Sequence, residues 1–310
     1  MMEKISFNRF QNSVGSRLTP TSEVEISAKL SHMSILPMME WFQTHNHICL
    51  ITEWMRGGDL LQALLEGICF TVEDKRRLFS EMCDGVKYLH HQGFTHRDLK
   101  PENCFLNSKD PGTTHLNIAD LGLTIKNEAL GDCRTFCGTL LYMAPDIFKF
   151  RQRNQLSLSG YGREADMWSL GVTLYILMSG EPPFEINPSL EKQILAGQYK
   201  LDGQVWTSVS KACRDLVDGL MLVDHRARLT AVQASNNPWV RAVEKHAYMQ
   251  ASFPFLSDSL FRDLLLTIGE ATSVYNLSLV SSSVRSAFAK ETWKDTLQAL
   301  VQHCTRRCLK

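Results

Sequence analysis

The feature that most constrains this sequence is residues 93–107, GFTHRDLKPENCFLN, where a dense group of polar residues runs directly into a short apolar stretch. Further along, CFLN and HLNIADLG flank the turn-forming sequence SKDPGTT, and this pattern predicts a β-hairpin within residues 104–122. The two open ends of a hairpin lie side by side. We therefore expect the polar residues before position 104 to lie close to Asp120, which follows the second strand.

The chemistry available at this end of the hairpin comes from Asp98, Lys100, Asn103 and Asp120. One carboxylate and one amide oxygen suit Mg²⁺, which binds a few protein oxygens and completes its shell with water and phosphate. A second carboxylate can orient the hydroxyl of a nucleophile, and a lysine can neutralise charge on a transferring phosphoryl group. For any one of these residues a solvated loop is the simpler explanation, but phosphoryl transfer is the reaction class that requires all four.

Residues 96–103, HRDLKPEN, match the protein-kinase catalytic loop H-R-D-x-x-x-x-N, and the sequence resembles eukaryotic protein kinases over about residues 3–240. ADLGL stands where that family has D-F-G, and CGTLLYMAPD resembles the end of the activation segment. Residues 197–230 are most similar to the calcium/calmodulin-dependent group, including checkpoint-type kinases. The resemblance implies an enzyme, a protein serine/threonine kinase, that uses ATP and Mg²⁺ and acts on protein substrates with basic residues before the Ser or Thr.

The resemblance also assigns roles to individual residues. Asp98 would be the catalytic base, Lys100 would stabilise the phosphoryl group, and Asn103 and Asp120 would bind Mg²⁺. Glu53 and Met55 would bind adenine through their backbone, and Asp59 and Glu102 would receive the basic residues of the substrate. The complete set of implied nucleotide-binding residues is Lys4, Glu23, Glu53, Met55, Asp59, Phe105 and Asp120.

The start of the chain departs from the family pattern. Lys4 precedes Glu23 by 23 − 4 = 19 residues, which fits the β3 lysine and αC glutamate of kinases, although its position alone fits a terminal surface lysine equally well. No G-x-G-x-x-G loop precedes MEKIS, and Leu121 replaces the usual Phe of D-F-G. An alternative function therefore stays open: a non-catalytic, kinase-like (pseudokinase) scaffold with weak or no nucleotide binding.

The resemblance further implies two anchors for the loops of the site. Asp166 would hold the catalytic loop from the start of a buried helix. Arg228 would pair with Asp146, which is one methylene shorter than the Glu of the A-P-E motif, so we expect a looser ion pair of the same sign.

The activation segment carries two threonines of interest. By resemblance, Arg97 would pair with a phosphate on this segment, and Thr135 is the best acceptor for it. An unmodified surface threonine explains Thr135 equally well. We expect Thr139 to hydrogen-bond near Asp98 and Lys100 instead.

These observations predict an α+β fold, a bilobal protein-kinase-like fold with a truncated β-rich N-lobe and a mainly helical C-lobe. HICLIT, residues 47–52, is typical of a buried strand, and the spacing of Leu78, Met82, Val86 and Leu89 predicts one face of a helix. LGVTLYILM, residues 170–178, predicts a buried core helix. The predicted domains are a kinase-like domain over residues 1–240, with the partial N-lobe in 1–55 and the C-lobe in 56–240, and a helical C-terminal extension over 241–310.

Composition limits the partners. The 33 basic and 33 acidic residues give no net charge, so we expect no nucleic acid and no membrane partner. The longest apolar run, residues 170–178, has about half the length that a membrane crossing requires. The nine cysteines follow no signal peptide, which predicts free thiols and a cytoplasmic location, with a nuclear location left open.

The end of the chain, residues 283–310, combines an apolar stripe that includes Trp293, Leu297 and Leu300 with the basic residues Arg306, Arg307 and Lys310. Such a helix is typical of a calmodulin target or of an autoinhibitory tail. A helix that simply packs on the domain is the alternative.

Overall fold

The computed structural model describes residues 22–45, 47–127, 133, 135–152 and 160–242, and the backbone of residues 2–6. The chain divides after Val243, and every element described below belongs to the first part, Met1–Val243. The predicted helical extension over 241–310 and the predicted calmodulin or autoinhibitory segment 283–310 therefore lie outside the described residues, apart from Arg241 and Ala242.

The N-terminal part combines one helix and one antiparallel sheet, and the predicted strand at residues 47–52 is confirmed. Ile48 and Leu50 of the central strand are buried and pack with Val24 of the helix, which explains why the HICLIT segment is apolar. The sheet order is β1-β3-β2. The elements are β1 (Met2–Ser6), α1 (Ser22–Ser27), β2 (Met38–Gln43) and β3 (His47–Thr52).

The predicted hairpin is confirmed and forms the middle of a second sheet. Its strands are β6 (Cys104–Leu106) and β7 (Leu116–Ile118), and β4 (Gly58–Asp59) pairs with the outer edge of β6. All four apolar residues at the strand ends are buried, and α3 packs against β7. A third, two-stranded sheet pairs β5 (Phe94–Thr95) with β8 (Ile125–Lys126) and so brings the segments on either side of the hairpin together.

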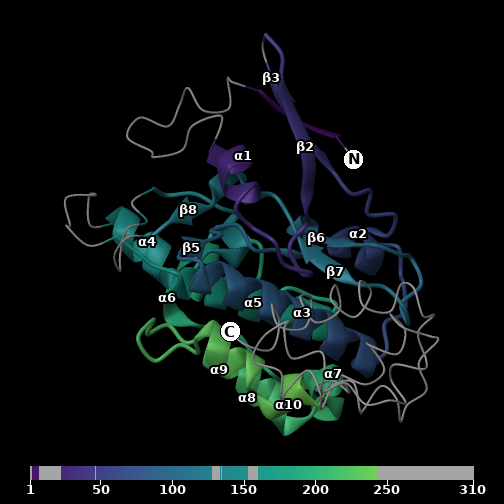
Figure 1. Cartoon of the computed structure of the whole chain (residues 1–310). Helices are drawn as coiled ribbons and strands as arrows, with labels where there is room; N and C mark the ends of the chain where they lie inside the picture. Colours follow the sequence, from purple (N-terminus) through teal and green to yellow (C-terminus); the bar gives the residue numbers. More distant parts are fainter. Residues whose placement is uncertain are drawn as a thin grey trace, which may run out of the picture. The chain divides into compact units, whose positions relative to one another are not determined.

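Helices make up most of the remaining described chain (Figure 1). Helix α3 (Val72–His91) begins with a capping box between Thr71 and Asp74, and it buries the predicted face of Leu78, Met82, Val86 and Leu89. Helix α5 (Glu164–Ser179) is buried along almost its whole length and contacts both α3 and α8 (Lys211–Leu220), which confirms the predicted core helix. The fold is α+β with a mainly helical C-lobe.

The shorter helices complete this part of the chain. They are α2 (Leu60–Leu65), α4 (Pro145–Gln152), α6 (Leu190–Ala196), α7 (Gly203–Ser208), α9 (Ala231–Ser235) and α10 (Pro238–Arg241), with 3₁₀ turns η2 (Pro101–Asn103), η3 (Leu121–Leu123) and η4 (Leu140–Tyr142). Among the described residues, no helix has the length and apolar character needed to cross a bilayer.

Candidate active site

One buried carboxylate, Asp166, anchors the loop between β5 and η2 through hydrogen bonds. Its oxygens accept hydrogen bonds from the backbone nitrogens of His96 (2.9 Å) and Arg97 (2.8 Å), and its Oδ2 lies 2.8 Å from His90 Nε2. Burial opposes ionisation of Asp166, but the hydrogen bond and charge of His90, the charge of His96 and the Arg97 N–H outweigh it and lower the pKa. These contacts hold Arg97 in the left-handed region, at φ 72°, and the predicted anchor is formed.

Directly after this anchored residue, the side chain of Asp98 joins Lys100, Asn103 and Thr139. Asp98 Oδ2 accepts from Lys100 Nζ at 2.8 Å and from Asn103 Nδ2 at 3.3 Å, while Oδ1 accepts from the Thr139 backbone N and from its Oγ1, both at 3.0 Å. Lys100 Nζ also donates to Thr139 Oγ1 at 2.8 Å, so Thr139 contacts both residues as predicted. Burial raises the pKa of Asp98, but Lys100, Thr139 and His96 together hold it below its usual value. Asp98 is therefore ionised at neutral pH.

The hairpin places Asp120 next to this cluster through Asn103. The Asn103 carbonyl accepts a hydrogen bond from Ala119 N at 2.9 Å, and its side-chain amide donates to the carbonyl of Asp98 at 2.8 Å. Asp120 follows Ala119 with φ 55° and ψ 73°, and its Oδ1 accepts from Gly122 N at 3.3 Å. Asn103 thus links Asp98 on one side to the Asp120 segment on the other.

These donors fit a magnesium ion. The Asn103 amide nitrogen is engaged by Asp98, so the amide oxygen is the atom that remains for a metal, and Asp120 supplies a carboxylate at the same end of the hairpin. Within the described ranges no group of three or more His, Cys, Asp or Glu residues could hold a metal by itself. A metal here would share its coordination with phosphate and water, which is the habit of Mg²⁺ rather than of Zn²⁺.

Glu23, predicted as the αC glutamate, lies on α1 and is 3% exposed. A Cβ atom added to Gly122 would lie 3.0 Å from Glu23 Oε2 and 3.2 Å from Asp120 Oδ1, so the two carboxylates flank this glycine. The backbone of Lys4 lies on β1 opposite Cys49 of β3, but its side chain is outside the described atoms. The predicted pairing of Lys4 with Glu23 stays a prediction.

The predicted hinge follows β3. Met55 is buried and packs with Leu36 and Ala119, and the half-buried Phe105 of β6 packs against the same cluster. Glu53 is exposed, and its carbonyl accepts from Thr52 Oγ1 at 3.3 Å. These apolar side chains could form one wall for a purine, and each backbone carbonyl keeps a second lone pair for a ligand.

Two further predicted residues lie on the C-lobe side of the hinge. Asp59 caps α2 by accepting from Gln62 N at 2.8 Å, and its backbone pairs with Phe105. Glu102 lies in η2 and is half-buried. Burial raises the pKa of Tyr142, and the charge of Glu102 and its side-chain hydrogen bond with Tyr142 raise it further, so the Glu102 carboxylate has Tyr142 as a partner.

The second anchor is also present. Arg228 Nη1 donates to Asp146 Oδ2 at 2.8 Å, and Arg228 is 3% exposed. Arg228 Nη2 and Asp146 Oδ1 are both buried without a hydrogen bond, although His225 Nδ1 lies 3.6 Å from that oxygen. The ion pair therefore uses one nitrogen and one oxygen, which is the looser geometry that the shorter side chain predicts.

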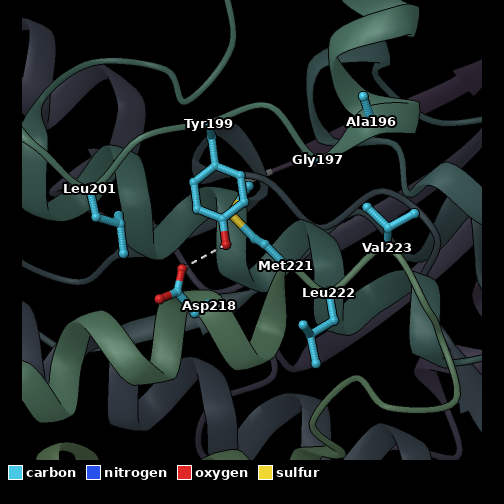
Figure 2. A pocket seen from close by; sticks show the side chains of 8 residues that line it. All are labelled: Ala196, Gly197, Tyr199, Leu201, Asp218, Met221, Leu222 and Val223. Carbon is cyan, nitrogen blue, oxygen red and sulfur yellow. Dashed lines mark hydrogen bonds between the residues drawn. The ribbon is translucent and has the colours of Figure 1, made fainter.

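A groove of about 460 Å³ lies elsewhere, between the end of α6 and the end of α8 (Figure 2). The hydroxyl of Tyr199 donates to Asp218 at 2.9 Å inside it. The lining residues are Ala196, Gly197, Tyr199, Leu201, Asp218, Met221, Leu222 and Val223. None of these residues belongs to the Asp98 cluster, so this groove is not part of the candidate active site.

Comparison with known proteins shows the family to which the chain belongs. Residues 5–240 match the family model of the protein kinase domain, so the chain belongs to the protein kinase family. It is 37% identical to human serine/threonine-protein kinase H1 over 246 residues, which cover 78% of this chain and 56% of that protein. It is 33% identical to a calcium/calmodulin-dependent protein kinase type 1 of Macrobrachium nipponense over 281 residues, which cover 90% of this chain and 71% of that protein.

A third relative, myosin light chain kinase A of Dictyostelium discoideum, is 36% identical over 227 residues, which cover 71% of this chain and 72% of that protein. The chain spans a little more than half the length of its relative kinase H1. The resemblance to serine/threonine kinases of the calcium/calmodulin-dependent type is thus confirmed.

Two contacts of the site were not predicted from the sequence. His90 reaches Asp166 from the end of α3, and Tyr161 contacts the activation segment from just before α5. His90 lies on an apolar helix face, where a histidine carries no spacing signal. Tyr161 follows a glycine in a loop, and nothing in that local pattern indicates its partner.

Proposed function

We propose that this chain transfers the terminal phosphoryl group of ATP to Ser or Thr hydroxyls of protein substrates, with Asp98 as the base that orients the hydroxyl. The observation that carries this proposal is the shared cluster of Asp98, Lys100, Asn103 and Thr139, whose side chains are joined by hydrogen bonds of 2.8 to 3.3 Å. An ionised carboxylate beside a lysine and an amide is the arrangement that phosphoryl transfer needs.

In this proposal Asp98 accepts a hydrogen bond from the substrate hydroxyl, and Lys100 places positive charge beside the incoming phosphoryl group. Thr139 keeps both side chains in place because it contacts each of them. Asn103 and Asp120 would hold Mg²⁺, which supplies charge neutralisation to the phosphates. The hinge residues Glu53 and Met55, with Phe105 and Asp59 nearby, would contact the adenosine part, and Lys4 and Glu23 would complete the nucleotide site.

Substrate choice is part of the proposal. Glu102 is half-buried, so part of its side chain reaches the surface, and its carboxylate would attract an arginine or lysine of a substrate. Asp59, at the N-terminus of α2, would offer a second carboxylate. We therefore propose substrates with basic residues before the Ser or Thr.

Regulation by calmodulin is proposed from similarity. A relative is named as a calcium/calmodulin-dependent kinase and aligns with 90% of this chain. Residues 283–310 would be the contact, either as a calmodulin target or as an autoinhibitory tail. Titration of a synthetic 283–310 peptide with calcium-loaded calmodulin tests this, and no binding at micromolar concentrations rejects the calmodulin part.

The central test is a thermal-shift titration of the full chain with ATP and Mg²⁺. We expect stabilisation that needs the metal and is lost in Asp120→Asn, while Asp215→Asn, an exposed carboxylate on α8 paired with Lys211, keeps it. Phosphate transfer from labelled ATP to a serine peptide with preceding arginines, lost in Asp98→Asn, tests the reaction itself. No shift at millimolar nucleotide and no transfer would favour the non-catalytic scaffold.

A further inference from the structure

Tyr161 contacts the activation segment at three alternate residues, Cys133, Thr135 and Cys137. Its backbone exchanges two hydrogen bonds with Cys133, the N–H of each donating to the carbonyl of the other at 3.1 Å. Its hydroxyl donates to the carbonyl of Thr135 at 2.7 Å and lies 3.6 Å from the Sγ atom of Cys137. One side chain and its peptide groups therefore hold the segment at residues 133, 135 and 137.

Burial and ring packing hold the side chain of Tyr161 in place. It is 4% exposed, and its ring packs edge-on against Phe150 of α4, with the ring centroids 6.1 Å apart. Burial raises the pKa of its phenol, helped by the neighbouring Cys137, so the hydroxyl stays a donor at working pH. Three residues further along the chain, α5 begins, and this is the helix that carries Asp166.

The contact of Tyr161 with the Thr135 carbonyl has a consequence at Arg97. The Thr135 hydroxyl accepts a hydrogen bond from Arg97 Nη1 at 2.6 Å, and Arg97 Nε donates to the carbonyl of Leu123 at 2.6 Å. Arg97 is 5% exposed and directly precedes Asp98. The hydroxyl of Thr135 thus links the segment to the catalytic loop.

We infer that Tyr161 is a positioning residue that holds Thr135 on Arg97 and so keeps residues 135–143 ordered against the catalytic loop. Tyr161 also acts on Arg97 directly: burial lowers the pKa of the Arg97 guanidinium, but the neighbouring Tyr161 and its hydrogen bond outweigh this and raise it. A phosphate on Thr135 would give Arg97 Nη2 a further acceptor. The kinetic part of this inference rests on the proposed kinase function, whereas the ordering of the segment does not.

The test compares two tyrosine-to-phenylalanine variants of the full chain, with Thr135 shown to be unphosphorylated by intact-mass measurement. Tyr161→Phe removes the hydroxyl that bonds Thr135 and keeps the ring. Tyr175→Phe is the matched control, because that buried hydroxyl donates to the carbonyl of Lys200 at 2.9 Å, on another part of the domain. Amide hydrogen exchange of peptides covering 135–143 is the readout.

We expect exchange over 135–143 to be about 3- to 10-fold faster in Tyr161→Phe than in the wild type, the effect of losing one hydrogen bond. It should not change in Tyr175→Phe. Equal exchange in all three proteins, or wild-type exchange as fast as that of an unstructured peptide, overturns the inference. If Tyr161→Phe does not fold, Thr135→Val replaces it, and unchanged exchange in Thr135→Val also overturns the inference.

A kinetic measurement separates positioning from mere packing. With a serine peptide that carries preceding arginines, Tyr161→Phe should lower kcat/KM several-fold, and adding Thr135→Glu should restore part of the loss by offering Arg97 a carboxylate. Loss without such restoration contradicts the role of the Thr135–Arg97 link. If the wild type and Tyr175→Phe transfer no phosphate at all, the proposed function fails, and the exchange data still decide on Tyr161.

Discussion

Replacing Asp166 by Asn is the sharpest test of how the catalytic loop is held. The carboxylate is 1% exposed and accepts hydrogen bonds from two backbone N–H groups and from His90. Asparagine has nearly the same shape, but one of its two terminal atoms is a donor. Whichever way the amide turns, at least one N–H group of the protein then faces another N–H group.

The magnitude follows from these contacts. If the amide oxygen replaces Oδ2, it keeps His96 N and His90, and the amide nitrogen faces Arg97 N. Losing that charged hydrogen bond and leaving a buried donor unsatisfied costs roughly 1.5 to 3 kcal/mol. The two surviving bonds become neutral ones and lose about 1 kcal/mol each. We therefore expect a loss of about 3.5 to 5 kcal/mol, a large share of the roughly 5 to 15 kcal/mol that stabilises a typical domain.

Urea unfolding at pH 7, followed by tryptophan fluorescence, measures this change in the free energy of unfolding. Asp215→Asn is the control, since its exposed pair with Lys211 on α8 should be worth less than about 1 kcal/mol. The rate of phosphate transfer should fall by more than the loss of folded protein explains, because Arg97 is then free to leave its φ of 72°. A loss below about 1 kcal/mol in Asp166→Asn, or one equal to that of Asp215→Asn, would refute the view that this carboxylate holds the loop.

Three further predictions concern stability. Gly57→Ala should cost about 1 to 3 kcal/mol, since its Cβ would lie 2.4 Å from the Ser108 carbonyl oxygen, whereas Gly112→Ala, with its nearest atom at 3.7 Å, should be nearly neutral in the same urea assay. Asp146→Glu should raise the melting temperature by roughly 2 to 4 °C, because the longer side chain can reach Arg228 Nη2; a lower melting temperature would contradict this. The lowered pKa values of Asp98 and Asp166 give stability that is fully present above about pH 4 and is lost as the pH falls through their native values, so wild-type stability should decline more steeply below pH 4 than that of Asp166→Asn.

The hairpin and the loop before it could be predicted because their signals are local. Alternating apolar residues around a Pro-Gly turn define β6 and β7, and the two open ends of an antiparallel hairpin lie side by side. The contact of Ala119 with Asn103 follows from that pairing. The helical face of α3 was equally predictable, since burial repeats with the period of the helix.

Other features depend on partners that are distant in the chain. Strand β2 carries the exposed residues Met39, Trp41 and Phe42, so it lacks the alternation that marks a half-buried strand, and its pairing with β3 decides its conformation. The hydrogen bond from Tyr161 to Thr135 joins residues that are 26 positions apart in the chain, and it depends on where α5 begins. Such contacts are set by tertiary packing and leave no periodic trace in the sequence.

The hydrogen bonds of Asp98 place a condition on the proposed reaction. A carboxylate offers about four acceptor sites, and Asp98 already receives four hydrogen bonds, two from Thr139 and one each from Lys100 and Asn103. A substrate hydroxyl must therefore displace one of them. The bond from Asn103 Nδ2 is the longest, at 3.3 Å, and the same nitrogen keeps a 2.8 Å bond to the Asp98 carbonyl. Displacing this contact costs least, because Asn103 stays anchored and its amide oxygen stays available to a metal while the carboxylate turns to the hydroxyl.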